Sequence, residues 1–294
     1  MLIATLIAAD RLRAGDIATA RDALSGVGGI PGVAEWIDDG LAADIPFRRI
    51  DATAARAALE GLIPMVDVVV HAHEHRRKKL LVADMDSTMI TIECIDELAD
   101  YAGIKAKIAE ITERAMQGEL DFEGALDARV ALLRGLDESV IERCREERVR
   151  LMPGARALVG TMRRNGAHCV LVSGGFTAFA DQVAEAIGFH QAIANHLDME
   201  SGRLAGTVRR PIVGAQTKKD TLLAETERLK LDPVLTLAVG DGANDIPMIQ
   251  AAGLGIAYRA KPKTAAAADG RIEAGDLRAL LHLQGYPVRE WAIE

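Results

Sequence analysis

The feature that most constrains the fold is a series of short apolar runs separated by helical segments, from residue 79 onward. The runs are "LLVAD", "HCVLVSGG", "VLTLAVGD" and "LGIAY". Continuous apolar strands that alternate with helices indicate a parallel sheet buried on both faces. Three of the runs end in polar or glycine-rich groups, and ligands of such sheets bind at the carboxyl ends of the strands. The sequence therefore predicts an α/β core of the Rossmann type with its chemistry at that edge.

Composition argues against nucleic acid and membranes as partners. The 294 residues carry a formal net charge of −8 and have no long basic stripe that could follow a phosphate backbone. No uninterrupted apolar run reaches the roughly 18 residues that a membrane helix needs. The apolar start "MLIATLIAA" has no basic segment before it and ends at Asp10, so we interpret it as a strand rather than a signal peptide. Three distant cysteines, an odd number, indicate a reducing, cytoplasmic compartment.

Residues 1–76 predict a small α+β domain of the ferredoxin-like kind, followed by a second domain at 77–294 after the basic run "HRRKK". The expected elements are a strand at 2–8, a helix at about 14–24, an extended part, a helix at about 53–62 and a strand at 66–71. His71, His73 and His75 alternate along the last strand, and we expect a solvated edge there rather than a metal-binding face.

A long insert separates the first two apolar runs. It extends from about residue 91 to 150, has helical periodicity and is too long for an ordinary crossover, so we expect a helical cap over the strand ends. Further along, "NHLDMESGRLAGTV" predicts a hairpin with a Ser-Gly turn.

Two acidic groups follow apolar runs. Asp84 and Asp86 stand two residues apart, so in an extended strand both project to one side. A strand end with a turn cap is the plain alternative, and a calcium loop fails because its required glycine and glutamate are absent. In "GDGAND", Asp241 ends a strand, whereas Asp245 makes a good helix N-cap. Carboxyl-bearing positions that offer oxygen alone suggest Mg²⁺.

Two further segments suit an anionic ligand. "VSGGF" offers the Ser173 hydroxyl and the N–H of Gly174 at a strand end that enters a helix, although a tight glycine turn is the alternative. In "TKKDTLL", Thr217 predicts an N-cap, so Lys218 and Lys219 occupy a first turn whose dipole disfavours cations. A lysine placed against the local field indicates an anionic ligand, with a solvated surface lysine as the alternative.

Together these groups suit phosphoryl transfer. Asp84 would attack phosphorus and form an aspartyl phosphate, which divides one difficult displacement into two. Asp86 would protonate the leaving alkoxide and later take a proton from the attacking water. Mg²⁺ and Lys218 would neutralise the charge of the transferring group, while Ser173 and Gly174 hold its oxygens.

The order of "DMDST", "SGG", a lysine and "GDGAND" resembles that of the haloacid dehalogenase-like phosphatases over about residues 79–286. Within that superfamily, "DMDSTMI" followed by Glu93, and "GDGANDIPMI", resemble the phosphoserine phosphatases. The resemblance implies Mg²⁺-dependent hydrolysis of O-phospho-L-serine to L-serine and phosphate, the last step of L-serine biosynthesis.

The resemblance also implies a role for each matching position. The catalytic positions are the nucleophile Asp84 and the general acid/base Asp86. The metal positions are the Asp84 carboxylate, the Asp86 backbone carbonyl and Asp241, with Asp245 near the metal. The phosphate positions are Ser173, Gly174, Lys218, for which Lys219 is the rival, and Asn244. The positions that read the serine moiety are Glu93 for its ammonium, Arg129 for its carboxylate, and the apolar cap residues Met116 and Phe122.

Other interpretations stay open. The substrate of the same mechanism could be another small phosphomonoester, such as phosphothreonine or phosphohomoserine, with transfer to another alcohol. A receiver-type signalling module is a different class, but such a module needs neither Asp86 as an acid nor a helical cap. The N-terminal domain resembles the amino-acid-binding ACT type without a ligand motif, so regulation, homodimerisation or packing remain open as its role.

Overall fold

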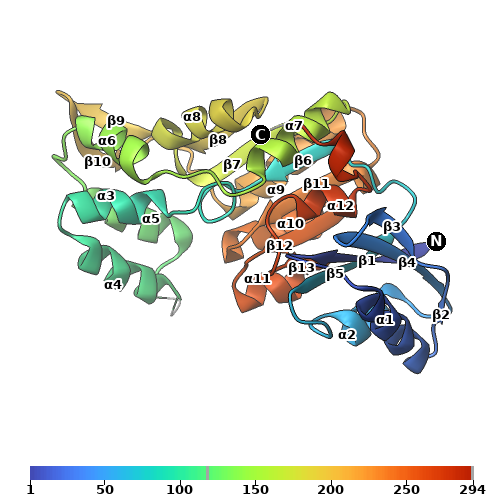
Figure 1. Ribbon diagram of the computed structural model, residues 1–294. Coiled ribbons are helices and arrows are strands. Elements are labelled where there is room, and N and C mark those ends of the chain that lie inside the picture. Colours follow the sequence, from blue (N-terminus) through green and yellow to red (C-terminus); the bar gives the residue numbers. More distant parts are fainter. Residues whose placement is uncertain (117–118, 293–294) are drawn as a thin grey trace.

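The computed structural model describes residues 1–116 and 119–292 and contains a five-stranded, a two-stranded and a six-stranded sheet (Figure 1). The N-terminal part, at one end of the molecule, consists of β1 (Leu2–Ala8), α1 (Ala14–Gly26), β2 (Ile30–Pro31), β3 (Glu35–Asp38), β4 (Ala42–Arg48), α2 (Ala52–Leu59) and β5 (Val66–Ala72). Its antiparallel strands have the order β2-β4-β1-β5, with β3 also paired to β4. This is the predicted ferredoxin-like arrangement, in which the extended part becomes β2, β3 and β4.

The two faces of the N-terminal sheet bury different partners, because alternate side chains of a strand point to opposite faces. One face packs Leu6 and its neighbours against α1 and α2 in a separate core cluster. The other face places Ile7 and Val69 in the main core of the chain. The predicted solvated edge is therefore wrong for His71, which is buried, with Nε2 3.0 Å from Thr5 Oγ1.

The six-stranded parallel sheet has the order β13-β12-β11-β6-β7-β8. Its strands are β6 (Leu80–Ala83), β7 (His168–Phe176), β8 (Gln191–Asn195), β11 (Thr236–Gly240), β12 (Leu254–Tyr258) and β13 (Gly270–Ile272). The helices and 3₁₀ turns around it are α7 (Ala155–Arg164), α8 (Thr177–Ile187), α9 (Ala215–Arg228), η1 (Pro233–Leu235), η2 (Ala243–Asp245), α10 (Ile246–Ala251), α11 (Pro262–Ala267), α12 (Ala279–Leu283) and η3 (Val288–Glu290).

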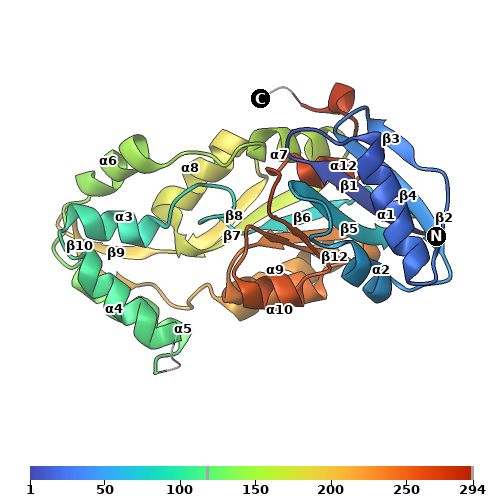
Figure 2. The same cartoon turned by 60° about the horizontal axis from the view of Figure 1, so that its bottom comes forward.

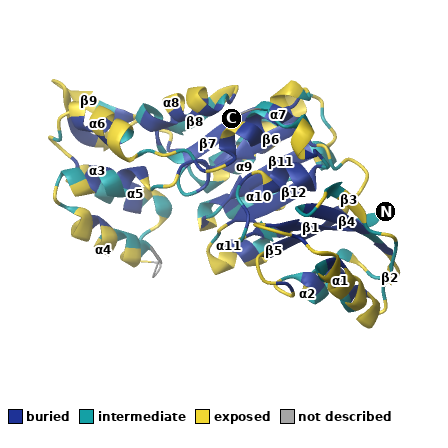
Figure 3. Cartoon of the chain, viewed as in Figure 1, coloured by how far each residue is buried: buried dark blue, intermediate teal, exposed yellow. Residues whose placement is uncertain are grey.

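Both faces of this sheet are covered, as the apolar runs predict, and the strands β6, β11 and β12 are buried along their whole length (Figure 3). Leu80 and Val82 pack with α9 and α10, whereas Leu81 and Ala83 pack with α7 and α8. From β6 the chain builds outward through β7 and β8, and from β11 it builds the other way through β12 and β13. The neighbours β6 and β11 therefore flank the topological switch point, where ligands of such sheets bind.

Of the helices described between β6 and β7, four lie at the end of the molecule away from the N-terminal part (Figures 1 and 2). They are α3 (Cys94–Tyr101), α4 (Lys105–Met116), α5 (Phe122–Leu132) and α6 (Ser139–Arg148). The chain enters and leaves them side by side, because Thr91 N–H donates to the Arg150 carbonyl at 2.9 Å. Two adjacent segments of the chain therefore connect this helical region, the cap, to the strand ends.

The predicted hairpin is confirmed as β9 (Leu197–Glu200) and β10 (Arg203–Val208). Its turn residues Ser201 and Gly202 have φ values of 51° and 75°, the left-handed pair that a tight hairpin turn requires. The hairpin extends the helical region, since Gly135 N–H donates to the Leu204 carbonyl at 2.8 Å. Among the described residues, no helix has both the length and the apolar character needed to cross a membrane.

Candidate active site

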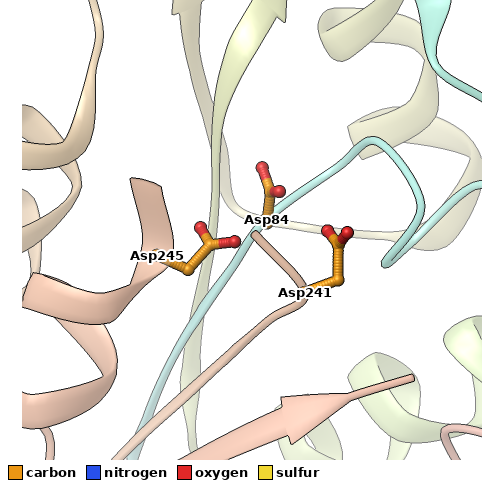
Figure 4. Close-up of side chains that lie close together, drawn as sticks. All are labelled: Asp84, Asp241 and Asp245. Atoms are coloured by element: carbon orange, nitrogen blue, oxygen red, sulfur yellow. The ribbon is translucent and has the colours of Figure 1, made fainter. Parts of the chain in front are cut away.

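The ends of β6 and β11 bring two acidic residues together. Ala83 pairs with Val239, and the N–H of Asp84 donates to the Val239 carbonyl at 3.0 Å. Asp84 and Asp241 therefore follow neighbouring strand ends, and Asp245 lies beside them (Figure 4). Each of the three offers a carboxylate oxygen within 4.8 Å of the others.

Lys218 extends from α9 into this acidic group and is 0% exposed. Its ammonium lies 2.5 Å from Asp84 Oδ1 and 2.6 Å from Asp245 Oδ1. The predicted N-cap at Thr217 is wrong: α9 begins at Ala215 after Gly214, and the Thr217 hydroxyl donates instead to the Ile212 carbonyl at 3.3 Å. Lys218 still lies in the first turn of α9, as predicted, and points into the sheet edge.

The charges of this cluster do not balance. Burial raises the pKa of the Asp84 carboxyl, and the Asp245 carboxylate raises it further, against the opposing effect of Lys218. Burial also raises the pKa of Asp241 to about 6, with Asp245 and Glu93 adding to the rise. Burial lowers the pKa of Lys218, but the carboxylates of Asp245 and Asp84 outweigh it and raise that pKa. Three carboxylates around one ammonium are an oxygen-rich, negatively charged site that fits a hard divalent cation.

Asp245 occupies the N-cap position of α10, as predicted, but its side chain makes no capping hydrogen bond to that helix. One carboxylate oxygen accepts the hydrogen bond from Lys218, and the other accepts from the N–H of Gly242 at 2.9 Å. A Cβ at Gly240 would lie 2.3 Å from Asp245 Cγ, so this carboxylate occupies space that glycine alone leaves. The sequence reasoning missed Gly240, although its place directly before Asp241 was the available signal.

Asp86 lies between the strand edge and the first cap helix. Its Oδ1 accepts from the N–H of Cys94 at 3.4 Å, at the start of α3. A Cβ on Gly175 would lie 2.8 Å from its Oδ2, so the side chain packs against the backbone of the "SGG" segment. Burial, followed by the charge of Glu93, raises the pKa of Asp86 to about 7. A carboxyl group that titrates near neutrality is suited to acid/base work.

Ser173 and Gly174 lie within the last residues of β7, because this strand extends to Phe176 and α8 begins only at Thr177. The predicted position at a helix end is therefore wrong. Ser173 is buried, and its Oγ accepts from the N–H of Gly175 at 2.8 Å. A Cβ on Gly174 would lie 3.8 Å from Nδ2 of Asn244, so these polar groups share the strand edge.

The cap contributes a carboxylate and a guanidinium. Glu93 directly precedes α3, is exposed, and accepts from Ser87 Oγ at 2.7 Å. Arg129 on α5 is half-buried; burial lowers its pKa, while the charges of Asp96, Glu93 and Asp86 oppose that shift. Arg129 and Glu93 are therefore electrostatic neighbours near the Asp86 carboxyl.

Two further residues adjoin the site. Phe122 begins α5, and a Cβ on Gly174 would lie 3.1 Å from its Cζ, so the cap contacts the "SGG" segment. The side chain of Met116 lies outside the described part of the chain.

Thr88, which the sequence reasoning missed, is buried and donates from Oγ1 to Asp241 Oδ1 at 3.3 Å. The sequence feature that could have identified Thr88 is its position in "DMDST", the motif that contains Asp84 and Asp86.

The family model for haloacid dehalogenase-like hydrolases matches residues 81–250. A phosphoserine phosphatase from Vibrio cholerae is 47% identical over 198 residues, 67% of this chain and 60% of that protein. The chain spans 56% to 65% of the length of the first curated relatives that it matches.

Two solved structures give the same result as the sequence comparisons. The unliganded crystal structure of a probable phosphoserine phosphatase from Vibrio cholerae has a TM-score of 0.78 and 34% identity, and the match covers 98% of this chain and 87% of that one. A phospho-aspartyl intermediate analogue of phosphoserine phosphatase has a TM-score of 0.65 and 38% identity, over 70% of this chain and 98% of that one. The chain belongs to the haloacid dehalogenase-like hydrolase family.

Proposed function

We propose that this protein is a phosphoserine phosphatase, which hydrolyses O-phospho-L-serine to L-serine and phosphate with Mg²⁺. The observation that carries the proposal is the buried Lys218 ammonium, 2.5 Å from Asp84 Oδ1, at the edge that Asp86 and the cap share. The names of the relatives at 47% and 34% identity support the same activity.

The chain's own residues would perform the reaction in two displacements. The Asp84 carboxylate attacks phosphorus, the bond from phosphorus to the serine oxygen breaks, and Asp86 gives its proton to that oxygen. Water then attacks the aspartyl phosphate while Asp86 takes its proton, which releases phosphate and restores Asp84. Ser173, Gly174, Lys218 and Asn244 are proposed to hold the phosphate oxygens throughout.

The acidic group would hold the metal ion. We assign the Asp84 carboxylate, the backbone carbonyl of Asp86 and Asp241 as its ligands, with Asp245 beside them. When bound, Mg²⁺ supplies positive charge that offsets the charge of the phosphoryl oxygens. The excess of carboxylates over ammonium groups at the strand edge supports this assignment.

Specificity is assigned to the cap, because the phosphate-holding groups are the same for every phosphomonoester. Phosphoserine carries an ammonium and a carboxylate on its organic part. Glu93 is proposed to bind the ammonium and Arg129 the carboxylate, and their placement around Asp86 supports this pairing.

We also propose a division into an ACT-like domain at residues 1–76 and a phosphatase domain at 77–294, with the helical cap at about 91–150. The separate core cluster of the N-terminal sheet and its helices supports that division. The cytoplasm is the proposed location, which is supported by the three free, buried cysteines, Cys94, Cys144 and Cys169.

The test is phosphate release from a panel of phosphomonoesters, with Mg²⁺ and with a chelator. We expect kcat/KM for O-phospho-L-serine to exceed the values for phosphothreonine, phosphohomoserine and p-nitrophenyl phosphate, and activity to vanish in the chelator. A clear preference for another ester would overturn the substrate, and full activity in the chelator would overturn the metal.

A further inference from the structure

The side chain of Asn195 connects the end of β7 to the segment that precedes α9. Asn195 is the last residue of β8 and is 1% exposed. Its Nδ2 donates to the carbonyl of Gly174 at 2.9 Å and to that of Val213 at 3.1 Å, and its Oδ1 accepts from the N–H of Val213 at 2.8 Å. Both amide hydrogens and the amide oxygen are therefore engaged.

The two connected segments lead to residues that are proposed to hold the phosphate. Gly174 belongs to the segment assigned to the phosphate oxygens. Val213 directly precedes Gly214, which is the N-cap residue of α9. The N–H of Lys218 donates to the Gly214 carbonyl at 3.1 Å. One amide group thus ties the "SGG" segment to the start of the helix that carries the lysine.

Gly174 and Gly214 both pack against one cap residue, the ring of Phe122. A Cβ on Gly174 would lie 3.1 Å from Phe122 Cζ, and one on Gly214 would lie 3.2 Å from Phe122 Cδ1. The backbone at both positions is therefore closely packed against Phe122, and a shift of either segment changes this contact. Asn195 forms hydrogen bonds with both segments.

We propose that Asn195 is a positioning residue, which holds Ser173 and Gly174 at the distance from Lys218 that the phosphate requires. This inference rests on the proposed phosphatase function. A misplacement of about 1 Å in a preorganised site can cost roughly 100-fold in rate, so an amide that sets the separation of these two segments affects the whole reaction.

The informative variant is Asn195→Asp, which keeps the shape and the acceptor but replaces both donors with oxygen. We expect kcat/KM to fall by about 100-fold, by a similar factor for O-phospho-L-serine and for p-nitrophenyl phosphate. Because both substrates share only the phosphate, the inhibition constant of inorganic phosphate should rise as well. Asn195→Ser, which is smaller and neutral, serves if the first variant does not fold, and should show the same parallel loss.

The matched control is Asn165→Asp at the end of α7, where Nδ2 donates to the Thr161 carbonyl at 2.8 Å, and it should keep wild-type kinetics. Each variant is assayed well below its own Tm, so a purely structural role would appear as a lower Tm with unchanged kcat/KM. That result, or a loss confined to phosphoserine, would overturn the inference. Failure of the proposed substrate would appear separately, in the wild-type protein, while p-nitrophenyl phosphate still tests Asn195.

Discussion

The ammonium of Lys218 lies 2.5 Å from Oδ1 of Asp84 and is completely buried. The ion pair joins the first turn of α9 to the end of β6, and Asp245 shares the same ammonium at 2.6 Å. Desolvating charges costs free energy that such contacts do not fully return, so buried ion pairs are weak sources of stability. An arrangement of this kind at a ligand-binding sheet edge indicates catalysis.

Replacing Lys218 should therefore remove activity. We expect Lys218→Met to lower kcat by about 10²- to 10³-fold at saturating Mg²⁺, because one preorganised positive group on the phosphate is lost. The adjacent residue provides the control: Lys219→Met removes the same charge from a half-buried neighbour and should stay within about twofold of wild type. Steady-state phosphate release measures both, and equal losses would show that the two lysines had been assigned wrongly.

Arg129 should discriminate between substrates. Loss of one charged hydrogen-bonding group costs about 2 kcal/mol, so Arg129→Ala should reduce kcat/KM for phosphoserine by roughly 30-fold. p-Nitrophenyl phosphate has no carboxylate, and its turnover should change little. The control is Arg114→Ala, which removes an exposed cap arginine that pairs with Glu119 at 2.9 Å. If Arg129→Ala harms both substrates alike, Arg129 does not bind the carboxylate of the substrate.

His71 should make the protein less stable in acid. Burial, followed by the charge of Arg76, lowers the pKa of His71 to about 4. Between pH 6.5 and 4 the unfolded chain then binds a proton that the folded protein does not, so stability falls as the pH falls. His71→Gln should reduce the loss of unfolding free energy between pH 6.5 and 5 by about 2 kcal/mol.

Urea denaturation at the two pH values measures this difference. His73→Gln is the control, since His73 is exposed just beyond the end of β5 and should leave the pH dependence unchanged. An unaltered dependence in the His71 variant would contradict the assignment of acid sensitivity to this residue.

Asp67 should link the N-terminal sheet to the part of the chain that contains the parallel sheet. Its carboxylate is buried and accepts from the N–H groups of Glu273, Ala274 and Gly275 at 2.9, 3.1 and 2.7 Å. Asp67→Ala leaves three donors without this partner and should lower the free energy of unfolding by about 3 kcal/mol.

The comparison for Asp67 is Asp51→Ala, which removes an exposed N-cap of α2 that bonds Ala54 N–H at 2.8 Å. That change should cost about 1 kcal/mol. Chemical denaturation measures the free energy of unfolding of both variants. Similar losses of unfolding free energy would show that Asp67 stabilises the protein no more than an ordinary surface N-cap does.

The parallel sheet was predictable because one feature of its sequence, the uninterrupted apolar runs, dominated. The apolar runs that became β6, β7, β11 and β12 show no alternation, because helices cover both faces of the parallel sheet. In the N-terminal part, β4 was not predicted as a strand. Its residues Ala42 and Ala43 are both buried, one toward each core, so the period of two disappears.

Several residues of the candidate site could be predicted from the sequence, but their geometry could not. The proximity of Asp84 and Asp241 depends on β6 and β11 being neighbours, and strand order comes from how the helices cross the sheet. The start of α9 at Ala215 was hidden because Gly214 offers no side chain as a capping signal. Asn195 carried no local signal at all, since its partners lie 21 and 18 residues away along the chain.

The most direct test of the account is to trap the phosphorylated enzyme. O-phospho-L-serine is mixed with the protein and Mg²⁺, the reaction is quenched in acid during turnover, and borohydride reduction converts an acyl-phosphorylated aspartate into homoserine. Peptide mass spectrometry should find homoserine at Asp84, and Asp84→Asn should neither release phosphate nor be modified. Steady turnover of phosphoserine with Asp84 unmodified, or full activity of Asp84→Asn, would contradict the account.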